Sequence, residues 1–242
     1  MLPLLLICAA AGPTPASPPQ QQAEKELILT ITSSELKGGV ISEITWDGKA
    51  LLLQGVFAES SGDLKTQYFV IPAESTKLEH RDDQTDTSLE YWRRKSNRVS
   101  PTGLGRIEYK SDTKMPQFGV GDLERRAVEA VEMGGTQTKT EVRIGSLTIH
   151  ERDGVPPYDG EVWSWSPVEL NRVAYVDTKG DLWVARADGA GARRIMKGDF
   201  TLPAWSEDGR IIAIAEKKDG GRRWEVSIIR LPKDVSENRF SR

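Results

Sequence analysis

Hydrophobic and polar residues alternate with a period of two along much of the chain after residue 24, as in β-strands with one buried face. Residues 27–32, 181–186 and 225–230 show this alternation. Residues 173–176 and 211–215 form short apolar runs bounded by turn residues, which is typical of strands covered on both faces. The pattern predicts an all-β protein built from short strands.

Glycine and aspartate separate many of these predicted strands. Asp188-Gly189, Asp208-Gly209 and Asp219-Gly220 supply residues that adopt positive φ in tight turns. The acidic segment 79–86 and the polar segment 93–117 are interpreted as long connections.

Residues 122–133 fit two patterns equally well. A helix would begin at the capping residue Asp122 and end at Gly134-Gly135. A strand would instead pair with residues 138–144 across the same glycine turn. The sequence leaves this choice open.

The clearest internal repeat consists of Trp165-Ser166-Pro167 and Trp205-Ser206-Glu207, which lie 40 residues apart. Each triplet precedes a turn, a basic residue and an apolar strand, and Asp208 and Gly209 belong to that turn in the second copy. A glycine-containing turn then leads to another alternating strand in both copies.

A fainter third copy begins near Asp47-Gly48-Lys49, which precedes the apolar residues 51–53. Residues 68–72 follow at nearly the same spacing as 228–232 in the C-terminal copy. In this register Ile44 takes the position of the repeated tryptophan.

A unit of about 40 residues with a few short strands cannot bury both of its faces alone. Radial stacking lets each small sheet cover the next, with Trp165 and Trp205 filling the space between blades. We therefore predict a β-propeller with blades of about 40 residues, against the alternative of an ordinary β-sandwich.

These motifs resemble the TolB-type propeller repeat, which runs Trp-Ser-Pro-Asp-Gly-Lys, apolar strand, turn, strand, Asp-Gly, Arg-Arg-Leu. The resemblance is clearest over residues 162–231, and the chain has room for about five or six blades, with an incomplete set as an alternative. It implies a repeat architecture found in periplasmic TolB, which binds partner proteins, and in non-catalytic gates before peptidase domains. It implies blades and no particular chemistry.

The N-terminus has the composition of an export signal. An unbroken apolar run at residues 4–11, too short to span a bilayer, leads to small residues. We expect a signal peptide at 1–16, a Pro/Gln-rich linker at 17–23 and the propeller domain at 24–242. Leu5-Leu6-Ile7-Cys8 also resembles a bacterial lipobox, although Ile7 stands where that pattern has Gly or Ala. The expected location is periplasmic or secreted, with lipid anchoring at Cys8 as an alternative.

Composition narrows the function classes. The formal net charge of −3 and 29% charged residues lack the basic field of a nucleic-acid-binding protein, so no nucleic-acid partner is expected. Cys8 is the one cysteine, which excludes a thiol nucleophile or a zinc-thiolate site in the rest of the chain.

The sequence carries no recognisable catalytic, metal or cofactor motif. His80 and His150, the two histidines, lack metal-ligand spacing, and a Gly-x-Ser-x-Gly element is absent. The aspartates at 82–86 lack the spacing of a calcium loop. We expect no cofactor, no metal and no catalytic residue.

The aromatic residues suggest a partner-contact rim. Trp183, Trp224 and Tyr158 are candidates for it, whereas Trp165 and Trp205 are expected in the blade core. The leading hypothesis is a non-catalytic binding or scaffolding propeller with envelope proteins as partners. The alternatives are a carboxylate-based glycan or peptide hydrolase or lyase, and a small-ligand or metal-binding sensor.

Overall fold

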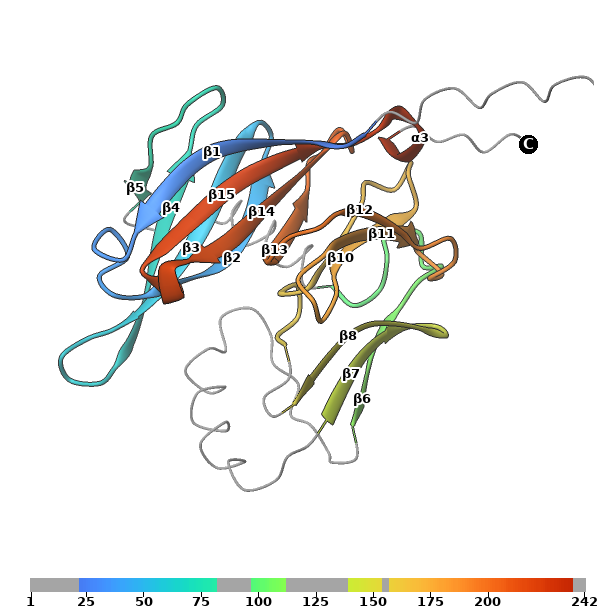
Figure 1. The fold of residues 1–242 in the computed structure, drawn as a ribbon, viewed down its shortest axis with the longest axis horizontal. Helices are drawn as coiled ribbons and strands as arrows, with labels where there is room; N and C mark the ends of the chain where they lie inside the picture. The colour runs from blue at the N-terminus through green and yellow to red at the C-terminus, as the bar shows by residue number, and fades with distance from the viewer. Residues whose placement is uncertain (1–21, 82–96, 112–138, 154–156, 237–242) are drawn as a thin grey trace, which may run out of the picture.

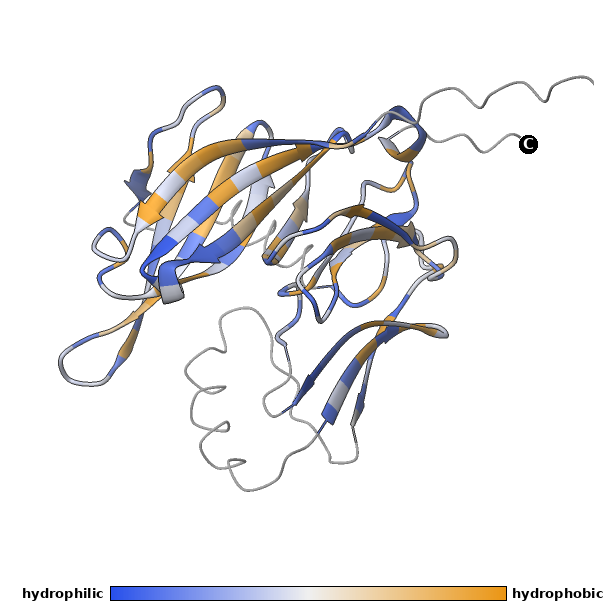
Figure 2. Ribbon diagram, viewed as in Figure 1, coloured by the Kyte–Doolittle hydropathy of each residue, from blue (hydrophilic) through white to orange (hydrophobic). Residues whose placement is uncertain are grey.

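The computed structural model describes residues 22–81, 97–111, 139–153 and 157–236 and is almost entirely β (Figure 1). Figure 2 shows that hydrophobic residues lie mainly on the strands. No helix in the described ranges is long and apolar enough to cross a membrane. The strands are β1 Glu24–Thr32, β2 Val40–Asp47, β3 Ala50–Ala58, β4 Leu64–Ile71, β5 Glu79–Arg81, β6 Ile107–Ser111, β7 Lys139–Ile144, β8 Leu147–Asp153, β9 Trp163–Trp165, β10 Arg172–Val176, β11 Leu182–Arg186, β12 Arg193–Met196, β13 Phe200–Trp205, β14 Ile211–Lys218 and β15 Arg223–Arg230. A short 3-10 helix, η1, spans Asp219–Gly221, and one α-helical turn, α3, spans Lys233–Ser236.

These strands form four small antiparallel sheets arranged as a four-bladed β-propeller. Blade 1 contains β2 to β5, blade 2 contains β6 to β8, and blade 3 contains β9 to β12. Blade 4 combines β13, β14 and β15 with the first strand of the chain, β1, on its outer edge. The N-terminal strand therefore completes the C-terminal blade.

The order of packing follows from contacts between strands of different blades. β2 of blade 1 packs against β13 of blade 4, and β13 in turn packs against β9 and β10 of blade 3. β8 of blade 2 contacts β10 of blade 3. Pairing of β1 with β15 thus fastens the start of the chain to blade 4, which packs beside blade 1.

Each hydrophobic cluster of the core lies between two neighbouring blades. The first joins blades 1 and 4 and contains Ile44 and Ile31, both fully buried. The second joins blades 3 and 4 around Trp205, and the third joins blades 2 and 3 around Trp163. Isolated blades of this size would leave these faces in water, so the fold is stable only as a stack.

The predicted all-β propeller is confirmed, but the predicted count of five or six blades is wrong. Residues 112–138 all lie between the neighbouring strands β6 and β7, so blade 2 spans far more sequence than a 40-residue unit. The choice of helix or strand for 122–133 lies outside the described residues. Segments 79–86 and 93–117 are not connections throughout, since they contain β5 and β6.

The buried Tyr175 makes the stability of the fold depend on pH in the alkaline range. Burial between blades, with the nearby Asp177 charge adding to it, raises the pKa of the Tyr175 phenol to about 12. The unfolded chain ionises this phenol near pH 10, so the folded state loses stability as the pH rises from 10 toward 12.

We expect the unfolding free energy of Tyr175→Phe to fall by about 1 to 2 kcal/mol less than that of the wild type as the pH rises above 10. The unfolding free energy near pH 7 should change little. Urea unfolding of both chains at pH 7, 9, 10 and 11 measures this difference. Burial also raises the pKa values of Tyr109 and Tyr68. The variant should therefore still lose some stability at high pH. Parallel pH profiles for the two chains would contradict the assignment.

Candidate functional site

The turn after the inner strand has the same hydrogen-bond design in blades 2, 3 and 4. A serine N–H donates to the carbonyl of a residue at or just before the start of the next strand, and the serine Oγ accepts that residue's N–H. All six distances lie between 2.8 and 3.1 Å. The pairs are Ser100 with Gly105, Ser166 with Arg172 and Ser206 with Ile211. The serine of the Trp-Ser motif is therefore a turn clamp.

Asp208 and Gly209 serve this turn in blade 4. The Asp208 carboxylate accepts the Ser206 hydroxyl at 2.6 Å and the Arg210 N–H at 3.0 Å. Gly209 has φ of +69°, and a Cβ there would lie 2.3 Å from a methyl group of Leu170 in the turn of blade 3. Both residues act in the blade turn, where the repeat placed them.

Sequence reading missed the repeat in blade 2 because Val99 stands where blades 3 and 4 carry tryptophan. Val99 forms a bridge with Arg106, and Ser100 makes the serine clamp. The signal was Ser100-Pro101-x-Gly103, which matches the Ser-Pro and Asp-Gly elements of the other copies. The turn packs closely, since a Cβ on Gly105 would lie 1.8 Å from the Ala187 carbonyl oxygen.

The register predicted for blade 1 is also wrong. Trp46, and not Ile44, corresponds to Trp205, because Trp46 pairs with Leu51 as Trp205 pairs with Ile212. The turn of blade 1 is two residues shorter than that of blade 4, which displaced the alignment.

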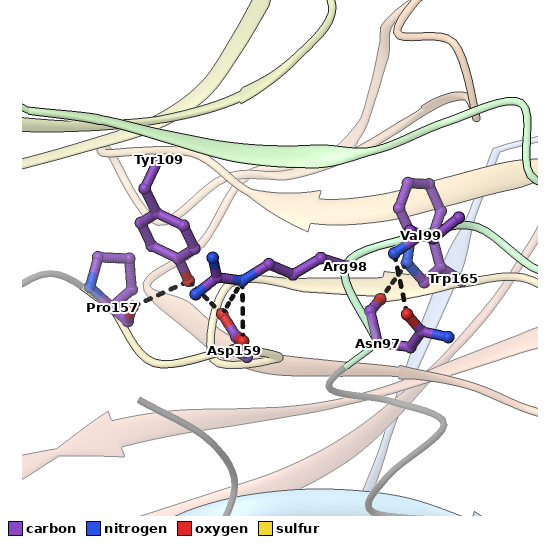
Figure 3. Close-up of polar contacts among 7 residues, drawn as sticks. All are labelled: Asn97, Arg98, Val99, Tyr109, Pro157, Asp159 and Trp165. Carbon is purple, nitrogen blue, oxygen red and sulfur yellow. Dashed lines mark hydrogen bonds and ion pairs between the residues drawn. The ribbon is translucent and has the colours of Figure 1, made fainter. Parts of the chain in front are cut away.

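Tryptophan N–H groups connect neighbouring blades. Trp46 Nε1 in blade 1 donates to the Ala204 carbonyl of blade 4 at 2.9 Å. Trp165 Nε1 in blade 3 donates to the Asn97 carbonyl at 2.7 Å, beside the bridge residue Val99 (Figure 3). Trp165 and Trp205 are 8% and 7% exposed, in keeping with their predicted place in the blade core.

These turns gather on one face of the propeller, which we call the turn face and define as residues 47–49, 99–106, 166–171 and 206–210. Antiparallel connection places every inner-strand turn at the same end of its blade. The turns are also in contact: Thr102 Oγ1 donates to Asn171 Oδ1 at 2.6 Å, and Leu170 covers Gly209.

Exposed apolar side chains are concentrated on the turn face. In the described part of the chain five large hydrophobic residues are exposed, and three of them are Val99, Leu104 and Val168, with exposed fractions of 39%, 67% and 50%. The other two lie elsewhere, Leu27 on the outer edge strand and Val40 at the opposite end of β2. The turn face is therefore the candidate contact surface of the described part of the chain.

A cavity of about 760 Å³ lies between blades 1 and 4 and borders the same face. Its walls include Trp46 and Lys49 from blade 1 and Glu207 and Asp208 from the turn of blade 4. Apolar side chains of both blades form its floor. The turn face thus combines an apolar surface with a pocket of the size that binds a side chain cluster or a small ligand.

The rim residues proposed from the sequence are largely packed. Trp224 is 5% exposed and belongs to the core between blades 1 and 4, so its ring is not available to a partner. Trp183 is half-buried: its ring stacks on Tyr175, Arg194 approaches its ring, and its N–H donates to Asp177. Both rings lie on strands paired with neighbours on both sides.

Tyr158 is also half-buried. It lies in the segment that leads into blade 3 and packs against the core of blades 1 and 4. Its backbone N–H donates to the Glu161 carboxylate. Tyr158 therefore connects the segment before blade 3 to the core that blades 1 and 4 share.

A polar cluster joins blade 2 to the same segment (Figure 3). The Arg98 Nε lies 2.9 Å from each oxygen of Asp159, and Tyr109 donates its hydroxyl toward Asp159 and the Pro157 carbonyl. Burial raises the pKa of Asp159, although Arg98 and Tyr109 oppose this, and burial with the Asp159 charge raises the Tyr109 pKa well above its usual value. Because its oxygens are engaged by two donors, Asp159 acts as a clamp between blades.

The histidines do not form a site. His150 on β8 is half-buried with Nδ1 3.1 Å from the Val176 carbonyl, and burial lowers its pKa. His80 is exposed on β5 against the edge of Phe69. Across the described ranges, no three His, Cys, Asp or Glu side chains are placed to hold a metal ion. The aspartates at 82–86 lie outside those ranges.

Comparison with known proteins identifies no family for this chain. The chain matches no family model and no curated protein. Among the solved structures that match is acylaminoacyl peptidase in complex with Z-Gly-Gly-Phe-chloromethyl ketone, with 12% identity and a TM-score of 0.23. The match covers 79% of this chain and 38% of that one, so the chain spans well under half of the peptidase. A likeness this low assigns no activity and no partner.

Proposed function

We propose that this chain is a non-catalytic β-propeller that binds a protein partner in the cell envelope through its turn face. The observation that carries the proposal is the exposure of Val99, Leu104 and Val168 on that face, which the cavity between blades 1 and 4 also borders. Protein interfaces bury apolar anchors in this way inside a polar rim.

Leu104 and Val168 would gain free energy from burial against a partner. Leu104 and Val168 sit in turns whose backbone is already held by serine clamps and by contacts between neighbouring turns. A rigid surface loses little conformational entropy on binding, so apolar area buried against a partner contributes more of its free energy to affinity.

The location in the envelope is supported by sequence alone. The apolar run at 4–11 and the Pro/Gln-rich linker suit export and a spacer before the first strand. The resemblance to TolB-type repeats, whose members include a periplasmic partner-binding protein, supports the same role.

The test places charge on the turn face. Leu104→Glu and Val168→Glu, combined in one chain, should reduce capture of the specific partner from envelope extracts at least about tenfold, since each buries a carboxylate at the contact. Val40→Glu is the matched control: its side chain is 41% exposed at the far end of β2, roughly 23 Å along the strand. Equal losses for both chains, or no loss for the double variant with an unchanged Tm, would contradict the proposal.

A further inference from the structure

The cavity between blades 1 and 4 has an apolar floor and an acidic rim. The floor includes Trp46, Leu51 and Ile71 of blade 1, all less than 10% exposed, together with Ile211 and Ile228 of blade 4. Trp46 has its N–H occupied by the Ala204 carbonyl, so its ring enters the cavity wall as an apolar surface. A ligand held here must present an apolar group to the floor.

Four carboxylates and two cationic side chains line the rim. The Glu26 and Arg230 side chains pair at 2.9 Å and neutralise one another at the wall formed by blade 4. The other charged side chains of the lining are Glu74, Glu207 and Asp208, which are acidic, and Lys49, which is basic. The potential at the rim is therefore negative, and it favours a cationic ligand.

The rim is held in place by local structure on both sides. Glu74 has φ of +60° in the loop 72–76, whose shape is fixed by Ser75 N–H donating to the Pro72 carbonyl. Asp208 is held by its two hydrogen bonds in the turn of blade 4. A non-glycine residue at positive φ is uncommon and is often retained where it serves a site.

We infer that this cavity binds a segment of the partner protein in which a bulky apolar side chain is flanked by Lys or Arg residues. The inference rests on the proposed function, because the cavity borders the turn face that the partner would cover. The apolar side chain fills the floor between the blades, and the flanking cations meet Glu74 and the carboxylates of the blade 4 turn.

Three seven-residue peptides with an N-terminal fluorophore test this by fluorescence anisotropy. The first is Lys-Lys-Leu-Phe-Leu-Lys-Lys, the second replaces every Lys with Glu, and the third replaces the Leu-Phe-Leu core with Ser-Ser-Ser. We expect the first peptide to bind at least about tenfold more tightly than either of the others, and its Kd to rise with salt.

Variants of the chain locate the binding. Glu74→Lys should weaken the first peptide about tenfold, and Ala73→Trp, on the same exposed loop, should block the cavity and abolish binding. Glu59→Lys is the control, since it makes the same change of charge in the exposed turn between β3 and β4 at the opposite end of blade 1. It should leave the Kd within about twofold, as expected for a screened distant charge.

Two results would overturn the inference: equal binding of the Lys and Glu peptides, or tight binding that Ala73→Trp does not change. Capture of the protein partner distinguishes a failure of this inference from a failure of the proposed function. If Leu104→Glu with Val168→Glu loses the partner while wild type binds none of the peptides, the cavity specificity is wrong and the docking face stands. If the peptides bind as expected but those charges do not affect partner capture, the docking face is wrong and the cavity stands.

Discussion

A chain that begins at Ser33, and so lacks β1, is expected not to fold into the propeller. β1 pairs with β15 through eight residue pairs and forms the outer strand of blade 4. Its removal takes the fully buried Ile31 from the core between blades 1 and 4 and breaks the ion pair of Lys25 with Glu216. Ladder hydrogen bonds contribute about 1 kcal/mol each and a buried isoleucine about 1.5–3 kcal/mol, which together match the 5–15 kcal/mol stability of a typical domain.

Far-UV circular dichroism during urea titration measures this outcome, with loss of a cooperative transition as the expected result. A permuted chain provides the control. Gln22 and Ser236 line the same cavity, so a short Gly-Ser linker can join them. The permuted chain starts at Ser33, runs to Ser236, continues through the linker to Gln22 and ends after β1. It therefore carries β1 at its C-terminus. The permuted chain should unfold at nearly the wild-type urea midpoint. A Ser33 chain that unfolds with the wild-type midpoint would show that β1 is not part of blade 4.

Trp205→Ala is expected to cost about 3–5 kcal/mol of unfolding free energy. The ring is 7% exposed and lies in the cluster between blades 3 and 4 with Leu170 and Ile212. Truncation leaves a cavity at a contact between two sheets that cannot close without moving a blade.

Trp205→Phe separates packing from hydrogen bonding. The Trp205 Nε1 is buried without a hydrogen-bond partner, so Phe keeps much of the ring volume and removes an unsatisfied donor. We expect Phe to cost less than about 1.5 kcal/mol. Urea unfolding of the three chains gives both values. A loss below about 1 kcal/mol for Trp205→Ala would mean that the ring does not hold blades 3 and 4 together.

The sequence predicted blades 3 and 4 well because both retain the motif that builds the turn. Tryptophan marks the inner strand, serine clamps the turn, and an apolar strand follows directly after the turn. Blade 2 keeps the serine but has Val99 in place of tryptophan, and residues 112–138 separate its strands. The repeat of blade 2 therefore lacks the tryptophan that identifies the copies in blades 3 and 4.

Local sequence patterns do not identify which strands pair when they lie far apart in the chain. The alternation at 27–32 correctly indicates a strand, yet nothing in it identifies β15, some two hundred residues away, as the partner. The register of blade 1 failed for a related reason, since a shorter turn moves Trp46 into the place assigned to Ile44.

The rim residues suggested by the sequence are not the exposed apolar residues of the turn face. Large aromatic side chains suit both cores and interfaces, and the structure places Trp224 in a core and packs the Trp183 ring against Tyr175 and Arg194. Leu104 and Val168 are single apolar residues in polar turns, and their shared face becomes visible only when the blades are stacked.

Site-specific photo-crosslinking tests the central claim, binding through the turn face, most directly. A benzophenone amino acid replaces Leu104, Val168 or Val40, one at a time, in the full chain expressed in a bacterial envelope. We predict the same discrete cross-linked protein at positions 104 and 168 and none at position 40. Cross-linking at Val40 but not at Leu104 or Val168, or none at any of the three, would contradict the account.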